Sequence, residues 1–349
     1  MTRTLALLLA LATPAAAQTD PAADQAASDA ATRGRVDAAI ADSGFAGTYA
    51  VYSGARRVAG GSVGAAVAGQ PGGFDFQAAW PWASVTKQVV ATLVMQEVEA
   101  GRVALDVPAG RYLPALSSGP QPTVRQLLQH RAGLRNPEGA PQGLAWCLSG
   151  RTAPGGNWSY NNCDYLVLGA LLERTTRTPL PQLFARRIAE PLGLTAGFIA
   201  PQATAPDAAW PGGPTPAERA EIARYGAAGA LVGTATDLIT FDRALLSNAL
   251  IPVGARDRMW AGDGKLGYMA LGQWAFSAPL SGCAGPVRIV ERRGSIGRFA
   301  VRNLILPDSG LSMVLFTNRG DPDDGPGSFG EIWQGKGITH RILSAAACR

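Results

Sequence analysis

The segment Trp82-Ala83-Ser84-Val85-Thr86-Lys87 opens the part of the chain that decides the fold. From Val85 to Val98 the sequence has the length and composition of a helix, and its apolar residues fall on all sides. A helix that is apolar all round is normally buried. Residues three apart share one helix face, so the Ser84 hydroxyl and the Lys87 amine can meet. The segment therefore predicts a buried helix with a Ser–Lys pair at its first turn.

This pair has the chemistry of a nucleophile and its base. A serine hydroxyl attacks poorly until a neighbouring base takes its proton, and a lysine can be that base only when it is neutral. Burial lowers a lysine pKa, whereas an arginine stays charged. The chain has 31 Lys and Arg residues, of which three are lysines, at positions 87, 265 and 336. First-turn N–H groups would also help to hold an oxyanion. The alternative is that Ser84 caps the helix and Lys87 is a surface residue.

Two further elements follow along the chain. Tyr160-Asn161-Asn162 precedes a second apolar helix. A tyrosine can relay a proton and an asparagine amide can orient a lysine and a substrate carbonyl, although the tripeptide alone is typical of a turn. Glu291-Arg292-Arg293-Gly294-Ser295 continues a predicted strand. There a small residue lets a substrate approach the strand edge, and a neighbouring cation would bind an anionic substrate.

These three elements, in this order, resemble the serine β-lactamase and penicillin-recognising family, especially its class C β-lactamase, DD-peptidase and esterase branch. Four more stretches between residues 45 and 320 are similar to the family: Glu99–Asp106, Leu127–Leu134, Glu190–Leu194 and Ala228–Leu231. The resemblance implies an α+β fold of the β-lactamase/transpeptidase type. In that fold helices flank an antiparallel sheet, and a mostly helical subdomain is inserted, here at about residues 100–225.

The resemblance also implies a role for each site residue. The implied catalytic residues are the nucleophile Ser84, its base Lys87, the proton relay Tyr160 and the orienting amide Asn162. The oxyanion hole would consist of the backbone N–H groups of Ser84 and Ser295. The implied substrate-binding residues are Arg292, Gly294 and Ser295. His130 matches a helix-end histidine of the family, which we interpret as structural.

Arg292 departs from the family pattern, which has a lysine or a histidine at this position. An arginine stays charged at any working pH and cannot shuttle a proton. It can bind a carboxylate through two hydrogen bonds, and its field can lower the pKa of Lys87 and Tyr160. We expect Arg292 to contact a substrate carboxylate, and the electrostatic role is the alternative.

Away from these motifs, strands are expected near both ends of the chain and helices in the middle. Expected strands cover residues 48–53, 57–63, 271–276, 287–291, 299–306 and 311–317, and expected helices cover 123–128, 166–172, 234–246 and 331–347. Thr234 with Asp237 resembles a capping box, which marks a helix start. This order indicates an α+β domain over residues 34–349 with a helical region inserted into it.

The N-terminus has the three-part pattern of a secretory signal peptide over residues 1–17. It begins with one positive charge, continues with a short apolar run and ends in small residues before Gln18. The alternative is a buried N-terminal helix. Residues 18–33 have almost no large apolar side chains, so we expect a flexible linker there. The protein is therefore expected to be exported, to the periplasm or outside the cell.

Export would permit disulfides between the four cysteines, Cys147, Cys163, Cys283 and Cys348. Four cysteines allow three pairings, and the pairing of Cys147 with Cys163 closes a short loop and leaves Cys283 with Cys348. Four buried free thiols are the alternative. The cysteines are not spaced as zinc ligands and the chain has two histidines, so we expect no metal and no cofactor.

Composition excludes several classes of protein. The net charge is +5 with scattered cations, which does not favour nucleic-acid binding. Apart from the N-terminus no long apolar run indicates stable membrane insertion. Gly60-Gly61-Ser62-Val63-Gly64 matches a nucleophile elbow, but no helix is expected after Ser62.

Together these patterns predict an exported serine hydrolase that acts through a covalent acyl-enzyme. Its expected partner is a small-molecule or peptidoglycan-like substrate: an amide, a peptidoglycan-like peptide, a β-lactam or an ester. The alternative is a catalytically silent, penicillin-binding-like protein that recognises peptidoglycan-type ligands. Arg292 motivates this alternative, and the intact Ser84, Lys87, Tyr160 and Asn162 argue against it.

Overall fold

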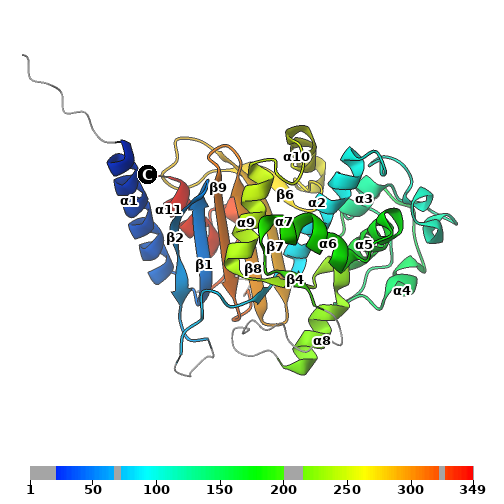
Figure 1. Cartoon of the computed structure of the whole chain (residues 1–349), viewed down its shortest axis with the longest axis horizontal. Coiled ribbons are helices and arrows are strands. Elements are labelled where there is room, and N and C mark those ends of the chain that lie inside the picture. The colour runs from blue at the N-terminus through cyan, green and yellow to red at the C-terminus, as the bar shows by residue number, and fades with distance from the viewer. Residues whose placement is uncertain (1–20, 67–71, 200–214, 322–326, 349) are drawn as a thin grey trace, which may run out of the picture.

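A six-stranded antiparallel sheet forms one half of the molecule (Figure 1). The computed structural model describes residues 21–66, 72–199, 215–321 and 327–348, so the predicted signal peptide, residues 1–17, lies outside the described residues. The strand order is β2-β1-β9-β8-β7-β6. The strands are β1 Gly47–Ser53, β2 Arg56–Val63, β6 Trp274–Ala278, β7 Val287–Ile296, β8 Phe299–Leu306 and β9 Leu311–Thr317.

Helices cover both faces of this sheet, so its central strands β8 and β9 are buried throughout. On one face lie α1 Pro21–Ala41 and α11 Gly337–Ala347, and on the other lie α2 Thr86–Glu99 and α9 Ala235–Leu246. Met313 and Leu315 of β9 join the core beneath α1 and α11. Val314 and Phe316 alternate with them and join the core beneath α2 and α9. Every residue of β9 is therefore buried.

The chain between β2 and β6 forms the other half of the molecule, which is mostly helical (Figure 1). Its longer helices are α5 Asn162–Thr176, α8 Pro216–Arg224 and α10 Val253–Met259. Shorter ones are α3 Val124–Leu128, α4 Leu144–Leu148, α6 Leu180–Phe184 and α7 Glu190–Leu192, with a π-helical turn at Ala185–Ala189. Single 3₁₀ turns occur at Ala83–Val85, Ala109–Arg111, Pro114–Leu116, Gly226–Ala228, Gly264–Leu266 and Ile332–Gln334. Strands β3 Trp80–Pro81, β5 Leu231–Gly233 and β4 Gly197–Phe198 form a second, small sheet.

Local signals in the sequence account for two helix starts. Thr234 accepts a hydrogen bond from the Asp237 N–H, and Asp237 accepts one from the Thr234 N–H, which confirms the predicted capping box of α9. Thr123 and Gln126 form the same reciprocal arrangement at the start of α3. Each box satisfies backbone donors that the first helical turn cannot pair.

The expected flexible linker at residues 18–33 is wrong over the part that the structure describes. Residues from Pro21 onward belong to α1, a helix that continues to Ala41. The segment is rich in alanine, the strongest helix former. Val36 and Ile40 near its C-terminal end are buried against the sheet and α11. This packing stabilises a helix that the polar composition of its first half did not indicate.

Three expected boundaries are also corrected. β6 begins at Trp274 because Gly272, with φ of 90°, and the buried side chain of Gln273 form a bend before it. β7 extends past Glu291 to Ile296 because β8 pairs with its whole polar end. The last helix begins at Gly337, since Gly335 and Gly337 have φ of 68° and 82° and interrupt the expected helix over 331–347.

Two disulfides join the four cysteines, and their pairing is the one in which Cys147 and Cys163 close a short loop. Cys147 is bonded to Cys163, and Cys283 is bonded to Cys348. The second bond connects the segment after β6 with the C-terminal end of α11. Among the described residues, no helix is both long and apolar enough to span a membrane.

We predict that replacing Cys283 and Cys348 together by serine lowers the free energy of unfolding by about 2–5 kcal/mol. The bond closes a loop of 65 residues, which constrains the unfolded chain. Denaturant titration of the double variant measures the change. The candidate site should remain assembled because the bond belongs to the core beneath α1 and α11. An unchanged unfolding midpoint would contradict this prediction.

Candidate active site

Ser84 lies at the first turn of the buried helix, after a strained backbone. Ala83 is fully buried and has φ of 45°, in the left-handed region that non-glycine residues rarely adopt. The 3₁₀ turn Ala83–Val85 leads directly into α2. Strain of this kind costs about 1–3 kcal/mol and persists only where the surroundings over-determine it. Here those surroundings are Trp80, Trp82 and Val85, all with no exposed surface.

Lys87 is fully buried and has three polar neighbours. Its Nζ lies 2.7 Å from the carbonyl oxygen of Ala228, 2.8 Å from Asn162 Oδ1 and 3.0 Å from Ser84 Oγ. Burial, and then the charge of Arg292, hold the pKa of Lys87 well below its usual range. A neutral amine has two N–H donors and one lone pair. Because the Ala228 and Asn162 oxygens can only accept, the lone pair is left for the Ser84 hydroxyl.

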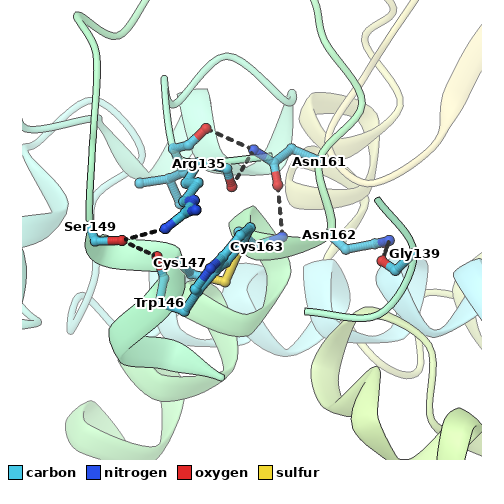
Figure 2. The surroundings of a disulfide bond; sticks show 9 residues. Arg135, Gly139, Trp146, Cys147, Ser149, Asn161, Asn162 and Cys163 are labelled. Carbon is cyan, nitrogen blue, oxygen red and sulfur yellow. Dashed lines mark hydrogen bonds between the residues drawn. A yellow bond between two sulfur atoms is a disulfide. The ribbon is translucent and has the colours of Figure 1, made fainter. Parts of the chain in front are cut away.

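Asn162 is held in place by its helix end and by a disulfide (Figure 2). The Asn161 side chain caps α5 by accepting from the Cys163 N–H at 2.8 Å. The Cys147–Cys163 bond then fixes this helix start to α4. Asn162 Nδ2 donates to the carbonyl oxygen of Gly139 at 3.3 Å, which orients the amide so that Oδ1 faces Lys87.

Tyr160 connects Ser84 with Arg292. The Tyr160 hydroxyl lies 2.5 Å from Ser84 Oγ, and Arg292 Nη2 donates to the Tyr160 oxygen at 3.5 Å. When Ser84 donates to a neutral Lys87, its oxygen is free to accept from Tyr160. The four side chains then form one chain of donors that runs from Arg292 through Tyr160 and Ser84 to Lys87.

Arg292 is buried beside Ser84 and Tyr160. Its side chain has no exposed surface, and its Nε donates to the Ser84 carbonyl oxygen at 2.9 Å. The guanidinium lies 5.1 Å from the Trp274 ring centre and 5.6 Å from that of Tyr160. No carboxylate within the described ranges forms an ion pair with it. The geometry therefore favours the electrostatic alternative, in which a fixed positive charge acts on Lys87 and Tyr160.

Gly294 brings β7 against the turn that carries Ser84. A Cβ atom at position 294 would lie 2.7 Å from the Ser84 nitrogen and 2.9 Å from the Trp82 carbonyl oxygen. Only a residue without a side chain fits this approach. The matched pairs of β6 and β7 end at Trp274 and Glu291, so the following residues of β7 present a free edge here.

Ser295 lies on that free edge and is exposed. β7 and β8 are joined by the two-residue turn Gly297-Arg298, with Ile296 opposite Phe299. In such a hairpin the pair next to the turn is hydrogen-bonded and the next pair, Ser295 with Ala300, is not. The Ser295 N–H therefore points away from β8, toward the free edge of β7.

Behind Tyr160 lies a buried pair, His130 and Asp164. His130 Nδ1 is 3.1 Å from Asp164 Oδ2 and accepts from the Asn161 N–H at 3.3 Å. Burial lowers the pKa of His130 and raises that of Asp164, which favours the neutral form of each group. The His130 ring packs 4.7 Å from that of Tyr160. This position agrees with the structural interpretation of His130.

The structure thus brings together Ser84, Lys87, Tyr160, Asn162 and Arg292, which the sequence places in three distant segments. It adds groups that the sequence analysis missed. The Ala228 carbonyl oxygen belongs to a stretch that was recognised only as similar to the family, and a backbone acceptor has no residue type to signal it. Asp164 lies in the first turn of α5, but nothing in the local sequence distinguishes it from a surface acid. Ser62 lies outside this group of residues. Its Oγ forms a hydrogen bond with Thr48 Oγ1 at 2.9 Å within the β1–β2 pair.

A family model for "Beta-lactamase" matches residues 32–334, and the chain belongs to this family. Esterase EstB of Burkholderia gladioli is 34% identical over 148 residues, which cover 34% of this chain and 38% of that protein. A D-aminopeptidase of Cereibacter sphaeroides (strain ATCC 17029 / ATH 2.4.9) is 30% identical over 131 residues, 33% of this chain and 25% of that protein. The aligned part of this chain thus spans well under half of either relative.

Solved structures show the same fold. A D-stereospecific amidohydrolase from Streptomyces superposes with a TM-score of 0.68 at 22% identity, over 92% of this chain and 98% of that one. The predicted β-lactamase/transpeptidase-like α+β fold is therefore confirmed. The family to which the chain belongs is one of serine hydrolases.

Replacing Gly294 by alanine should separate β7 from the Ser84 turn and abolish most activity, because the added methyl group would collide with backbone atoms. Gly285→Ala is the matched control, since a Cβ there meets nothing within 4 Å. We expect Gly294→Ala to lower the rate of covalent labelling by about 100-fold or more, the scale of losing an oxyanion donor. Equal labelling rates for the two variants would show that the close approach is unimportant.

Proposed function

We propose that the protein is a serine hydrolase that cleaves an ester or amide through a covalent acyl-enzyme on Ser84. The observation that carries this proposal is the position of Lys87. Its amine is buried, its two N–H donors have obligatory acceptors, and its lone pair faces Ser84 Oγ at 3.0 Å. A neutral amine in this position is ready to take the serine proton.

Acylation follows from this arrangement. Lys87 Nζ takes the Ser84 proton as Oγ forms a bond to the substrate carbonyl carbon, and the carbonyl π electrons move to its oxygen. The N–H groups of Ser84 and Ser295 stabilise that oxyanion. Tyr160, hydrogen-bonded to Ser84 Oγ, then donates its proton to the leaving group and is reprotonated from Lys87. The bond to the leaving group breaks, and an ester on Ser84 remains.

Deacylation repeats these steps with water. The Lys87–Tyr160 pair accepts a proton from the water that attacks the acyl carbon, and Ser84 Oγ leaves and is reprotonated. Arg292 supports both steps, because its fixed charge disfavours a charged Lys87 and stabilises negative charge on the Tyr160 oxygen.

The proposed substrate is defined by its reacting group, which is an ester or an amide. The relatives' names include an esterase and D-aminopeptidases, which supports an ester or amide, with a peptidoglycan-like peptide or a β-lactam as members of the same carbonyl class. Two disulfides support export, since such bonds persist in oxidising compartments. The continuous series of hydrogen bonds from Arg292 through Tyr160 and Ser84 to Lys87 supports a catalytic role and not a silent binding role.

Replacing Ser84 by alanine should abolish covalent labelling by a fluorophosphonate and lower ester hydrolysis by about a thousandfold or more. Ser62→Ala is the control, because Ser62 belongs to β2 and contacts Thr48. Intact-mass measurement after incubation with the reagent reports the labelled fraction. Labelling that persists in Ser84→Ala and vanishes in Ser62→Ala would refute the proposed site.

Replacing Arg292 by glutamine should move the acidic limb of the kcat/KM profile to higher pH. Lys87 accepts a proton only when neutral, so activity is lost as the pH falls through its pKa. Removing the Arg292 charge raises that pKa. Arg293→Gln is the control, because Arg293 is paired with Glu331 at 2.8 Å and does not contact Lys87.

The two roles of Arg292 separate when a neutral and a carboxylate-bearing ester are compared. An electrostatic role predicts the same displaced limb for both esters. A loss confined to the carboxylate-bearing ester, with the limb unmoved, would show that Arg292 binds the carboxylate directly.

A further inference from the structure

Two tryptophans form an angled aromatic pair beside the site. Trp158 precedes Tyr160 by two residues and is 36% exposed. Its ring centre lies 6.2 Å from that of Trp274, and the two ring planes are inclined by 56°. Large exposed aromatic side chains are uncommon on a free surface and are frequent where a partner group docks.

Each tryptophan of this pair is linked to Ser84 by a short series of side-chain contacts. The Trp274 ring lies 5.1 Å from the Arg292 guanidinium, which donates to Tyr160, and the Tyr160 hydroxyl lies 2.5 Å from Ser84 Oγ. The Trp158 and His130 rings form an edge-to-face contact with centres 6.3 Å apart, and the His130 ring centre lies 4.7 Å from that of Tyr160. A substituent that extends from a carbonyl group held at Ser84 past Tyr160 would therefore reach the two rings.

The charges around the pair define what could bind there. Within the described part of the chain, the charged groups that lie on Trp274 are the guanidinium groups of Arg292 and Arg293, at 5.1 and 5.5 Å. Both would repel a cationic substituent. An anion placed here could not form a direct ion pair, because Arg292 has no exposed surface and Arg293 is already paired with Glu291 and Glu331. An uncharged group remains favourable.

The inclination of the rings further restricts the shape of that group. Aromatic rings prefer edge-to-face or offset contacts with centres about 4.5–7 Å apart. The two indole rings already contact each other, and their planes are inclined by 56°. A flat ring can therefore pack only on their outer surface, against the face of one indole and the edge of the other. A linear alkyl group would contact the same surface without this complementarity.

We propose that Trp158 and Trp274 form an aromatic subsite, which binds an uncharged aromatic ring in the substrate of Ser84. This proposal rests on the proposed hydrolase function. It makes Trp158 and Trp274 determinants of specificity, and it distinguishes aromatic esters or amides from aliphatic ones.

The test compares two neutral esters, 2-phenylethyl acetate and butyl acetate, which share their acyl group and have primary alcohol leaving groups. The wild-type protein should prefer the aromatic ester in kcat/KM. Trp158→Ala should lower the ratio of the two kcat/KM values by about three- to tenfold, the scale of one aromatic pair. Trp158→Phe should restore most of that ratio.

Trp333→Ala is the matched control. Trp333 is also exposed, at 48%, but its ring contacts Phe276 and Arg293 and does not belong to the Trp158–Trp274 pair. The ratio should stay at its wild-type value in this variant.

Several results would overturn the subsite. One is an unchanged ratio in Trp158→Ala. Another is an equal fall for both esters with a displaced acidic limb, which would show that Trp158 only shields Arg292 from water. Failure of the underlying function is distinguishable, because Ser84 would then not be labelled by a fluorophosphonate in the wild-type protein.

Discussion

The buried amine of Lys87 is the constraint on which the site depends. A charged amine without a paired anion is costly in a protein interior, so burial itself favours the neutral form. The Ala228 carbonyl oxygen and Asn162 Oδ1 then occupy both N–H donors. The first comes from the turn before β5 and the second from the start of α5. Three segments distant in sequence must therefore meet around one nitrogen atom, and the disulfide at Cys163 holds one of them in place.

Strand β7 lies against the turn that carries Ser84, and two of its residues shape the site in different ways. Gly294 lets the strand approach the strained turn at Ala83, while Arg292 places a permanent charge beside Tyr160. A lysine or histidine at this position could exchange protons, but the guanidinium cannot. Its proposed role is electrostatic, and its Nε also holds the Ser84 carbonyl oxygen. In the proposed mechanism Lys87 and Tyr160 carry the proton transfers, so the acidic limb of the pH profile reports the titration of one amine.

Much of this arrangement could be predicted where one residue type has one physical role. The Ser–Lys spacing, the capping box at Thr234 and the apolar strands of the sheet belong to this group, and the fold followed from the family resemblance. Contacts set by tertiary packing could not be predicted. The sequence shows that Arg292 is a cation but not that it is buried, and it shows Trp158 and Trp274 without their inclination. The start of α1 was missed because its helix is stabilised by packing at its far end.

The central claim, that Lys87 is a neutral base, can be measured directly. The chain has three lysines, at positions 87, 265 and 336, so NMR spectra of protein labelled at lysine Cε and Nζ contain few signals. Lys87→Met assigns the signal of Lys87 by its disappearance. The account predicts that this amine titrates well below the usual lysine pKa, while Arg292→Gln moves its titration upward. Three lysines that all titrate near the usual value would contradict the account.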